Sequence, residues 1–129
     1  MAHILVVEDD DSMRHAIAQA VSVMGHRPSQ ARDGRECLAV HQADPCDVVV
    51  TDIVMPEKDG LGLIYDLRKQ TPSVRIVAIS GGGLVPAREY LRIAKGMGAA
   101  AVLEKPFVAR QLTTIIADLL KDGTVAAPA

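Results

Sequence analysis

Short apolar runs impose the strongest limit on how this chain can fold. Three of them lie at Ile4–Val7, Val48–Val50 and Ala101–Leu103, and they are rich in valine and isoleucine. Runs of about four such residues are typical of strands that are covered on both faces of a parallel sheet. In an open parallel sheet, ligands bind at the carboxyl ends of the strands. The residues that follow these runs are therefore expected to share one edge of the sheet.

Between the runs, apolar residues recur at steps of three and four, which predicts amphipathic helices. The predicted strands are residues 4–7, 27–31, 47–51, 74–79 and 100–103. The predicted helices cover residues 13–24, 37–41, 61–67, 87–97 and 112–120. Pro28 favours an edge position for the second strand, because proline cannot donate to a central ladder. This alternation predicts an α/β fold: a doubly wound, five-stranded parallel sheet with helices on both faces.

Length and composition predict one domain. The chain has 129 residues, which suits a single core, and residues 1–122 are expected to form it. Residues 123–129 lack an apolar period and are expected to be a flexible tail. The net charge of −2 argues against a nucleic-acid partner, because proteins that bind phosphate backbones usually carry a basic excess.

The location expected from the sequence is the cytoplasm. No apolar stretch approaches the ~20 residues of a membrane span, so no membrane partner is expected. The first predicted strand begins too early to leave room for a signal peptide. Cys37 and Cys46 lack metal-ligand spacing and are interpreted as ordinary reduced cysteines.

Acidic residues follow two of the apolar runs. Glu8 and Asp9 come after the first run, and Asp52 comes after the run at Val48–Val50. Two carboxylates about 4 Å apart repel by about 4 kcal/mol at an effective dielectric near 20. A divalent cation removes this cost, and a small cluster of oxygen ligands suits Mg²⁺. The alternative is that Glu8 and Asp9 are solvated helix caps.

Asp52, Lys105 and Ser80 complete a potential phosphoryl site. A carboxylate such as Asp52 can attack phosphorus and form an aspartyl-phosphate. Lys105 follows the last apolar run and can pair with Asp52 and then with the phosphoryl group. Ser80 ends the fourth predicted strand and can donate a hydrogen bond to a phosphoryl oxygen. A cis bond before Pro106 would aim the lysine inward, at a cost of about 0.5–1 kcal/mol, and the sequence is compatible with either isomer.

Over essentially its whole length, the chain resembles a receiver domain of the two-component response regulators. The resemblance rests on the acidic pair after the first strand, the Thr-Asp-Ile-Val-Met-Pro segment around Asp52, the serine after strand four, and Lys105-Pro106-Phe107 after strand five. These elements occur in the family's order and at plausible spacing. The resemblance implies a flavodoxin-like fold with strand order 2-1-3-4-5.

The resemblance also implies a function. Asp52 would accept a phosphoryl group from a histidine kinase or a histidine phosphotransfer protein, with Mg²⁺ held by Glu8 or Asp9, by Asp52 and by the backbone carbonyl of Val54. Ser80 and Lys105 would read out the phosphoryl group. They would shift the face formed by the fourth helix, fifth strand and fifth helix, where an unknown downstream protein would bind.

Two positions depart from the family's pattern. Receivers often carry an aromatic residue three positions before the lysine, and Val102 stands there without a ring to reorient. A rotamer switch at this position is therefore not expected, and Val102 alternatively just fills its strand. The second departure is the glycine run that begins at Gly81, directly after Ser80. This segment would either close on phosphorylation or form a surface turn.

The expected function is a stand-alone switch without an output domain. It would catalyse only its own phosphorylation and dephosphorylation, and it is not expected to be an enzyme in any wider sense. One alternative is a Mg²⁺-dependent phosphohydrolase with an aspartyl nucleophile. Such hydrolases usually carry a second aspartate two residues after the first, where this chain has Val54. The other alternative is a receiver domain clipped from a longer DNA-binding regulator.

Overall fold

The computed structural model describes residues 1–53, 60–81 and 86–126. Within them the strands are β1 (His3–Val7), β2 (Arg27–Ala31), β3 (Val48–Asp52), β4 (Arg75–Ser80) and β5 (Ala101–Glu104). The helices are α1 (Asp11–Val23), α2 (Gly34–Ala43), α3 (Gly60–Gln70), α4 (Ala87–Gly96) and α5 (Ala109–Ala126). All pairings in the sheet are parallel, and the strand order is β2-β1-β3-β4-β5. The predicted fold class and strand order are confirmed.

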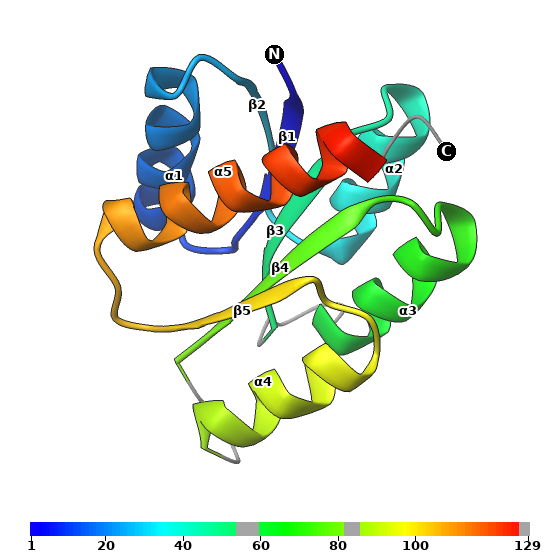
Figure 1. Cartoon of the computed structure of the whole chain (residues 1–129). Coiled ribbons are helices and arrows are strands. Elements are labelled where there is room, and N and C mark those ends of the chain that lie inside the picture. The colour runs from blue at the N-terminus through cyan, green and yellow to red at the C-terminus, as the bar shows by residue number, and fades with distance from the viewer. Residues whose placement is uncertain (54–59, 82–85, 127–129) are drawn as a thin grey trace.

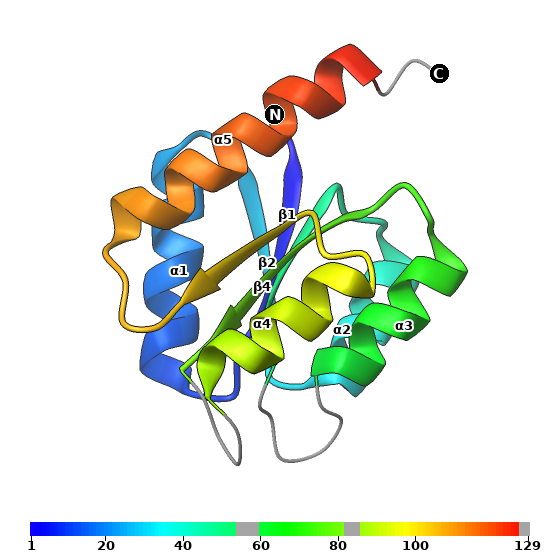
Figure 2. The same ribbon diagram turned by 60° about the horizontal axis from the view of Figure 1, so that its bottom comes forward.

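The sheet separates two layers of helices. Helices α1 and α5 cover one face, and α2, α3 and α4 cover the other (Figure 1; Figure 2). Alternation along each strand feeds both layers: in β1, Ile4 and Val6 pack towards α1 and α5, whereas Leu5 and Val7 pack towards the other layer. Every residue of β1 and β3 is buried, as expected for central strands covered on both faces.

The two outer strands differ from the central ones. Strand β2 is an edge strand, as Pro28 predicts, and within it only Ala31 is buried. Strand β5 is the other edge, and the prediction that its apolar run is buried on both faces is wrong. Residues Ala101–Leu103 are only half-buried, because β5 has a neighbouring strand on one side only.

Several strands and one helix end at other residues than the sequence predicts. Strands β3, β4 and β5 each end one residue later than predicted, because their last polar residues still pair with the neighbouring strand. Helix α5 continues to Ala126, past the predicted start of the tail at Gly123. The prediction ended this helix where its apolar stripe ends, but such a stripe indicates only which part of a helix packs against the core. The helix itself can continue beyond the stripe. Residues 127–129 lie outside the described residues.

The helices were compared with the length and apolar character needed to cross a membrane. Within the described residues, none of the helices combines the length and the apolar character that a bilayer crossing requires.

Candidate functional site

The carboxyl ends of four strands meet at one edge of the sheet. Strand pairing places Val7 beside Thr51, so the residues that follow, Glu8 and Asp52, become neighbours. In the same way Ser80 pairs with Glu104, directly before Lys105. One carboxylate oxygen of each of the three predicted acids, Glu8, Asp9 and Asp52, lies within 4.8 Å of the other two. The structure therefore brings together the acids that the sequence analysis singled out.

Lys105 bridges two of these acids. Its Nζ donates to Asp52 Oδ2 at 2.8 Å and to Glu8 Oε1 at 3.0 Å. The side chains of Glu8 and Asp52 are 3 % and 8 % exposed, so both contacts lie largely out of water. The Lys105 backbone N–H donates to the carbonyl oxygen of Ser80 at 2.9 Å, and the peptide bond to Pro106 is cis. The ammonium group of Lys105 thus binds two acids that precede it by 97 and 53 residues in the sequence.

The environment shifts the acid–base behaviour of this pair. Burial raises the pKa of Glu8 to about 6, although the hydrogen bond from Lys105 acts in the opposite direction. Burial also acts to lower the pKa of Lys105, but its hydrogen bonds to Asp52 and Glu8 outweigh burial and raise that pKa. Near pH 7 the lysine is therefore charged, and Glu8 is mostly ionised.

The set of donors fits a magnesium ion. Three carboxylates carry three negative charges and Lys105 supplies one positive charge, which leaves an excess of two negative charges (3 − 1 = 2). At 4.8 Å and an effective dielectric of about 20, two like charges repel by about 3 kcal/mol. A small divalent cation that prefers oxygen ligands matches both the charge and the ligand type. The predicted backbone ligand, Val54, lies outside the described residues.

The backbone around Asp52 is tightly constrained. Its carbonyl oxygen accepts a hydrogen bond from the Thr51 hydroxyl at 2.8 Å, and the N–H of Ile53 donates to Ile79 at 2.9 Å. The first residue of α3, Gly60, donates its N–H to Ile53 at 2.6 Å. A Cβ atom at Gly60 would lie 2.5 Å from Ile53 Cα and 2.6 Å from the Asp52 carbonyl oxygen. Only glycine lets α3 begin this close to the end of β3.

The remaining predicted residues surround Lys105. Ser80 is fully buried at the end of β4. A Cβ atom added at Gly81 would lie 3.3 Å from Lys105 Cβ, so the aliphatic part of the lysine runs along the Gly81 backbone. Val102 is half-buried on β5 and pairs with Ala78 of β4. The rest of the glycine run, with residues 82–85, lies outside the described residues.

Sequence reasoning missed Arg14, which is only 7 % exposed. Its guanidinium donates to the Glu8 carbonyl oxygen at 3.0 Å, directly behind the acidic cluster. A signal for its burial was present in the sequence. Arg14 precedes Ile17, Ala18 and Val21 by three, four and seven residues, and these three residues form the buried face of α1.

Two of the four histidines, His3 and His41, are buried. Both lie among polar partners that tie loops together. The Cys46 N–H donates to His41 Nδ1 at 3.1 Å, and His41 Nε2 lies 2.9 Å from the Thr71 hydroxyl.

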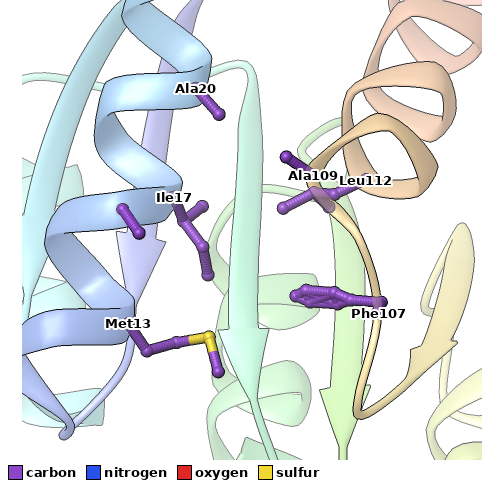
Figure 3. A pocket seen from close by; sticks show the side chains of 7 residues that line it. Met13, Ile17, Ala20, Phe107, Ala109 and Leu112 are labelled. Atoms are coloured by element: carbon purple, nitrogen blue, oxygen red, sulfur yellow. The ribbon is translucent and has the colours of Figure 1, made fainter.

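An apolar groove runs between α1 and α5, with a volume of about 120 Å³ (Figure 3). Met13 and Ile17 of α1 face Phe107 and Leu112 across it, and alanines line the remainder. The side chains that line this groove are apolar, so the groove itself offers no acid, base or nucleophile.

Comparison with known proteins agrees with this assignment. The family model described as the response regulator receiver domain matches residues 4–117. The response regulator receiver protein CpdR of Brucella abortus is 33 % identical, and the alignment covers 93 % of this chain and 98 % of that protein. The response regulator MprA of Mycolicibacterium vanbaalenii is 33 % identical, over 94 % of this chain and 51 % of MprA.

Solved structures give the same result. The crystal structure of NtrX from Brucella abortus matches with a TM-score of 0.91 and 32 % identity, over 98 % of this chain and 28 % of that one. The chain spans about half or less of the length of several curated relatives. The match to the family model nevertheless covers most of the chain, and CpdR is matched over nearly its whole length. This chain belongs to the response regulator receiver domains, the phosphorylation-dependent switches of two-component signalling.

Proposed function

We propose that Asp52 is the phosphoacceptor of this receiver domain and that its phosphoryl donor is the phosphohistidine of a histidine kinase or phosphotransfer protein. The observation that carries the proposal is the Lys105 ammonium, which bridges Asp52 and Glu8 at 2.8 Å and 3.0 Å. In the transfer, a carboxylate oxygen of Asp52 forms a bond to phosphorus. The phosphorus–nitrogen bond breaks, and its electron pair stays on the histidine ring of the donor.

Glu8, Asp9 and Asp52 would hold Mg²⁺ beside the acceptor, together with the Val54 carbonyl group that the family resemblance suggests. The bound ion supplies positive charge that neutralises the phosphoryl oxygens and the attacking carboxylate. The carboxylate cluster and its excess negative charge support this role.

Lys105 and Ser80 would report the phosphorylated state. After transfer, the ammonium of Lys105 can leave Asp52 and pair with a phosphoryl oxygen. The Ser80 hydroxyl can donate to a second phosphoryl oxygen. Gly81 follows Ser80 and Pro106 follows Lys105, and these two neighbours would fix the backbone positions from which the serine and lysine side chains extend. Because Val102 has no ring to reorient, the signal would pass through movement of the backbone near Ser80 and Lys105.

The output would be a protein contact on the face formed by α4, β5 and α5, in the cytoplasm. The domain is a signalling module, and we propose that it turns over no substrate besides its own phosphoryl group. A phosphohydrolase would need an acid or base two residues after Asp52, where the chain has valine. Relatives with and without additional length are both known, so the length of the parent gene decides between a stand-alone receiver and one part of a larger regulator.

The test is phosphorylation by a small acyl-phosphate donor in the presence of Mg²⁺, followed by intact-protein mass spectrometry. We expect one added phosphoryl group on the wild type and none on Asp52→Ala. Asp118→Ala removes an exposed aspartate from α5 and should leave the addition unchanged. Absence of the adduct from the wild type, or its persistence in Asp52→Ala, would refute the proposal. Rapid release of phosphate over many turnovers would instead support the phosphohydrolase.

A further inference from the structure

Arg14 is a buried charge, and each of its three guanidinium nitrogens donates a hydrogen bond. Its Nη1 donates to the Glu8 carbonyl oxygen at 3.0 Å, its Nε to Gln30 Oε1 at 3.1 Å, and its Nη2 to Asp11 Oδ1 at 2.6 Å. These partners come from the residue after β1, from β2 and from the start of α1. A buried guanidinium is tolerated only when its donors are satisfied, so this arrangement is a built feature of the fold.

The link from Arg14 holds the turn that carries two of the acids. The backbone of Glu8 is held on both sides: its N–H donates to Ala31 at 3.1 Å, and its carbonyl oxygen accepts from Arg14. The side chain of Glu8 accepts from the N–H of Asp10 at 3.2 Å. Asp9 lies between these two anchored residues, so the direction of its carboxylate depends on the same turn.

We infer that Arg14 is a positioning residue that holds Glu8 and Asp9 in the arrangement that binds Mg²⁺. This inference rests on the proposed function of the acidic cluster. Like charges within 4.8 Å push one another apart, and a loosely held turn would let them separate. A turn that is already fixed gives the ion its ligands without a further ordering cost.

The geometry and the charge of Arg14 have opposite effects on the affinity for Mg²⁺. A positive charge behind the cluster opposes the binding of a cation, so loss of charge alone would tighten Mg²⁺ binding. Loss of the fixed fork of donors would weaken it. Lysine keeps the charge but offers a single ammonium in place of the planar fork, so it cannot span partners on three elements. Arg14→Lys therefore isolates the positioning effect.

The experiment is a calorimetric titration with Mg²⁺ at a temperature where urea curves show each variant to be folded. We expect about a tenfold weaker Kd for Arg14→Lys, as is typical when a partner behind a metal ligand is lost. The rate of phosphorylation by an acyl phosphate should fall at low Mg²⁺ and recover at saturating Mg²⁺. Arg32→Lys is the matched control, because Arg32 is an exposed arginine paired with Glu36, and its Kd should stay within twofold.

A second variant covers the case in which Arg14→Lys does not fold. Gln30→Ala removes one anchor of the guanidinium at an exposed position, and it should weaken Mg²⁺ binding by a few fold. A Kd that stays within twofold, or tightens, in every folded variant overturns the inference while the wild type still binds Mg²⁺ and accepts phosphate. A wild type that does neither overturns the proposed function as well as the inference.

Discussion

Replacing Lys105 with methionine should destabilise the domain in a way that depends on pH. Methionine keeps an apolar stem of similar length but removes the positive charge that lies 2.8 Å from Asp52 Oδ2 and 3.0 Å from Glu8 Oε1. Two nearly buried carboxylates then face each other without this counter-ion. Removing one partner of a buried ion pair is costly because the remaining charge is left uncompensated.

Proton uptake by Glu8 limits the size of this loss. A glutamate with an ordinary pKa of 4.5 is ionised at pH 7, and the variant can avoid charge repulsion by keeping Glu8 protonated in the folded state. Holding that proton across 2.5 pH units costs about 3 kcal/mol. The wild type already carries about 2 kcal/mol of this cost at pH 7, because its Glu8 pKa is about 6. We therefore expect Lys105→Met to lose about 1 kcal/mol more unfolding free energy than the wild type through Glu8 at pH 7.

The sign of the pH dependence follows from the raised pKa of Glu8. Where the folded pKa exceeds the unfolded one, the folded state binds the proton more tightly, so stability increases as the pH falls. The wild type gains from this effect below its Glu8 pKa of about 6. In Lys105→Met the pKa of Glu8 is higher still, so its unfolding free energy rises by more, and over a wider pH range, as the pH falls. Its deficit should narrow by about 1 kcal/mol between pH 7 and pH 5.5.

Urea unfolding followed by circular dichroism, with EDTA present, measures the loss of unfolding free energy at pH 7 and its change between pH 7 and pH 5.5. Lys121→Met removes an exposed lysine from α5 and should match the wild type at either pH. Added Mg²⁺ should stabilise Lys105→Met more than the wild type, because the ion replaces the missing positive charge. A loss that is the same at pH 7 and pH 5.5, or that Mg²⁺ does not reduce, would refute the view that Lys105 stabilises the site by neutralising Glu8 and Asp52.

Three further substitutions test the packing of the fold and a buried histidine by the same method. Gly60→Ala should cost about 1–3 kcal/mol or more, because its Cβ would meet backbone atoms at 2.5 Å and 2.6 Å. Gly96→Ala should instead stabilise by up to about 1 kcal/mol, since nothing lies within 4 Å of its Cβ, and equal effects at the two glycines would contradict the packing argument. Burial and the nearby His3 lower the pKa of His41, so below pH 6.5 the unfolded state binds more protons at this residue and stability falls. His41→Gln should therefore be less stable at pH 7 but should lose less on acidification from pH 6.5 to pH 5, and parallel pH curves would show that His41 does not titrate differently in the folded state.

The fold and the main site residues could be predicted because each depends on local patterns. The apolar runs place the strands, and the carboxyl ends of parallel strands must share an edge, so Glu8, Asp52 and Lys105 could be grouped before any coordinates were known. The shared edge follows from parallel pairing alone, whereas the close approach of Glu8 and Asp52 depends on β1 and β3 being neighbours.

The parts that could not be predicted depend on neighbours distant in sequence. The burial of Arg14 becomes clear only when Gln30 and Glu8 are seen to supply its partners. The half-buried state of β5 depends on its place at the edge of the sheet, which its apolar residues do not reveal. His41 is buried because residues 46 and 71 supply polar partners for its ring, and charge or polarity alone predicts the opposite.

The strand order explains why the site lies between β1 and β3. The chain leaves β1 through α1 towards β2 on one side, and it leaves β3 through α3 towards β4 on the other. The helices that follow these two neighbouring strands, α1 and α3, cover opposite faces of the sheet (Figure 2). Glu8 and Asp52 end the two strands at this point, and Lys105 reaches it from β5 past Ser80. The acids therefore lie where the chain leaves two neighbouring strands in opposite directions along the sheet.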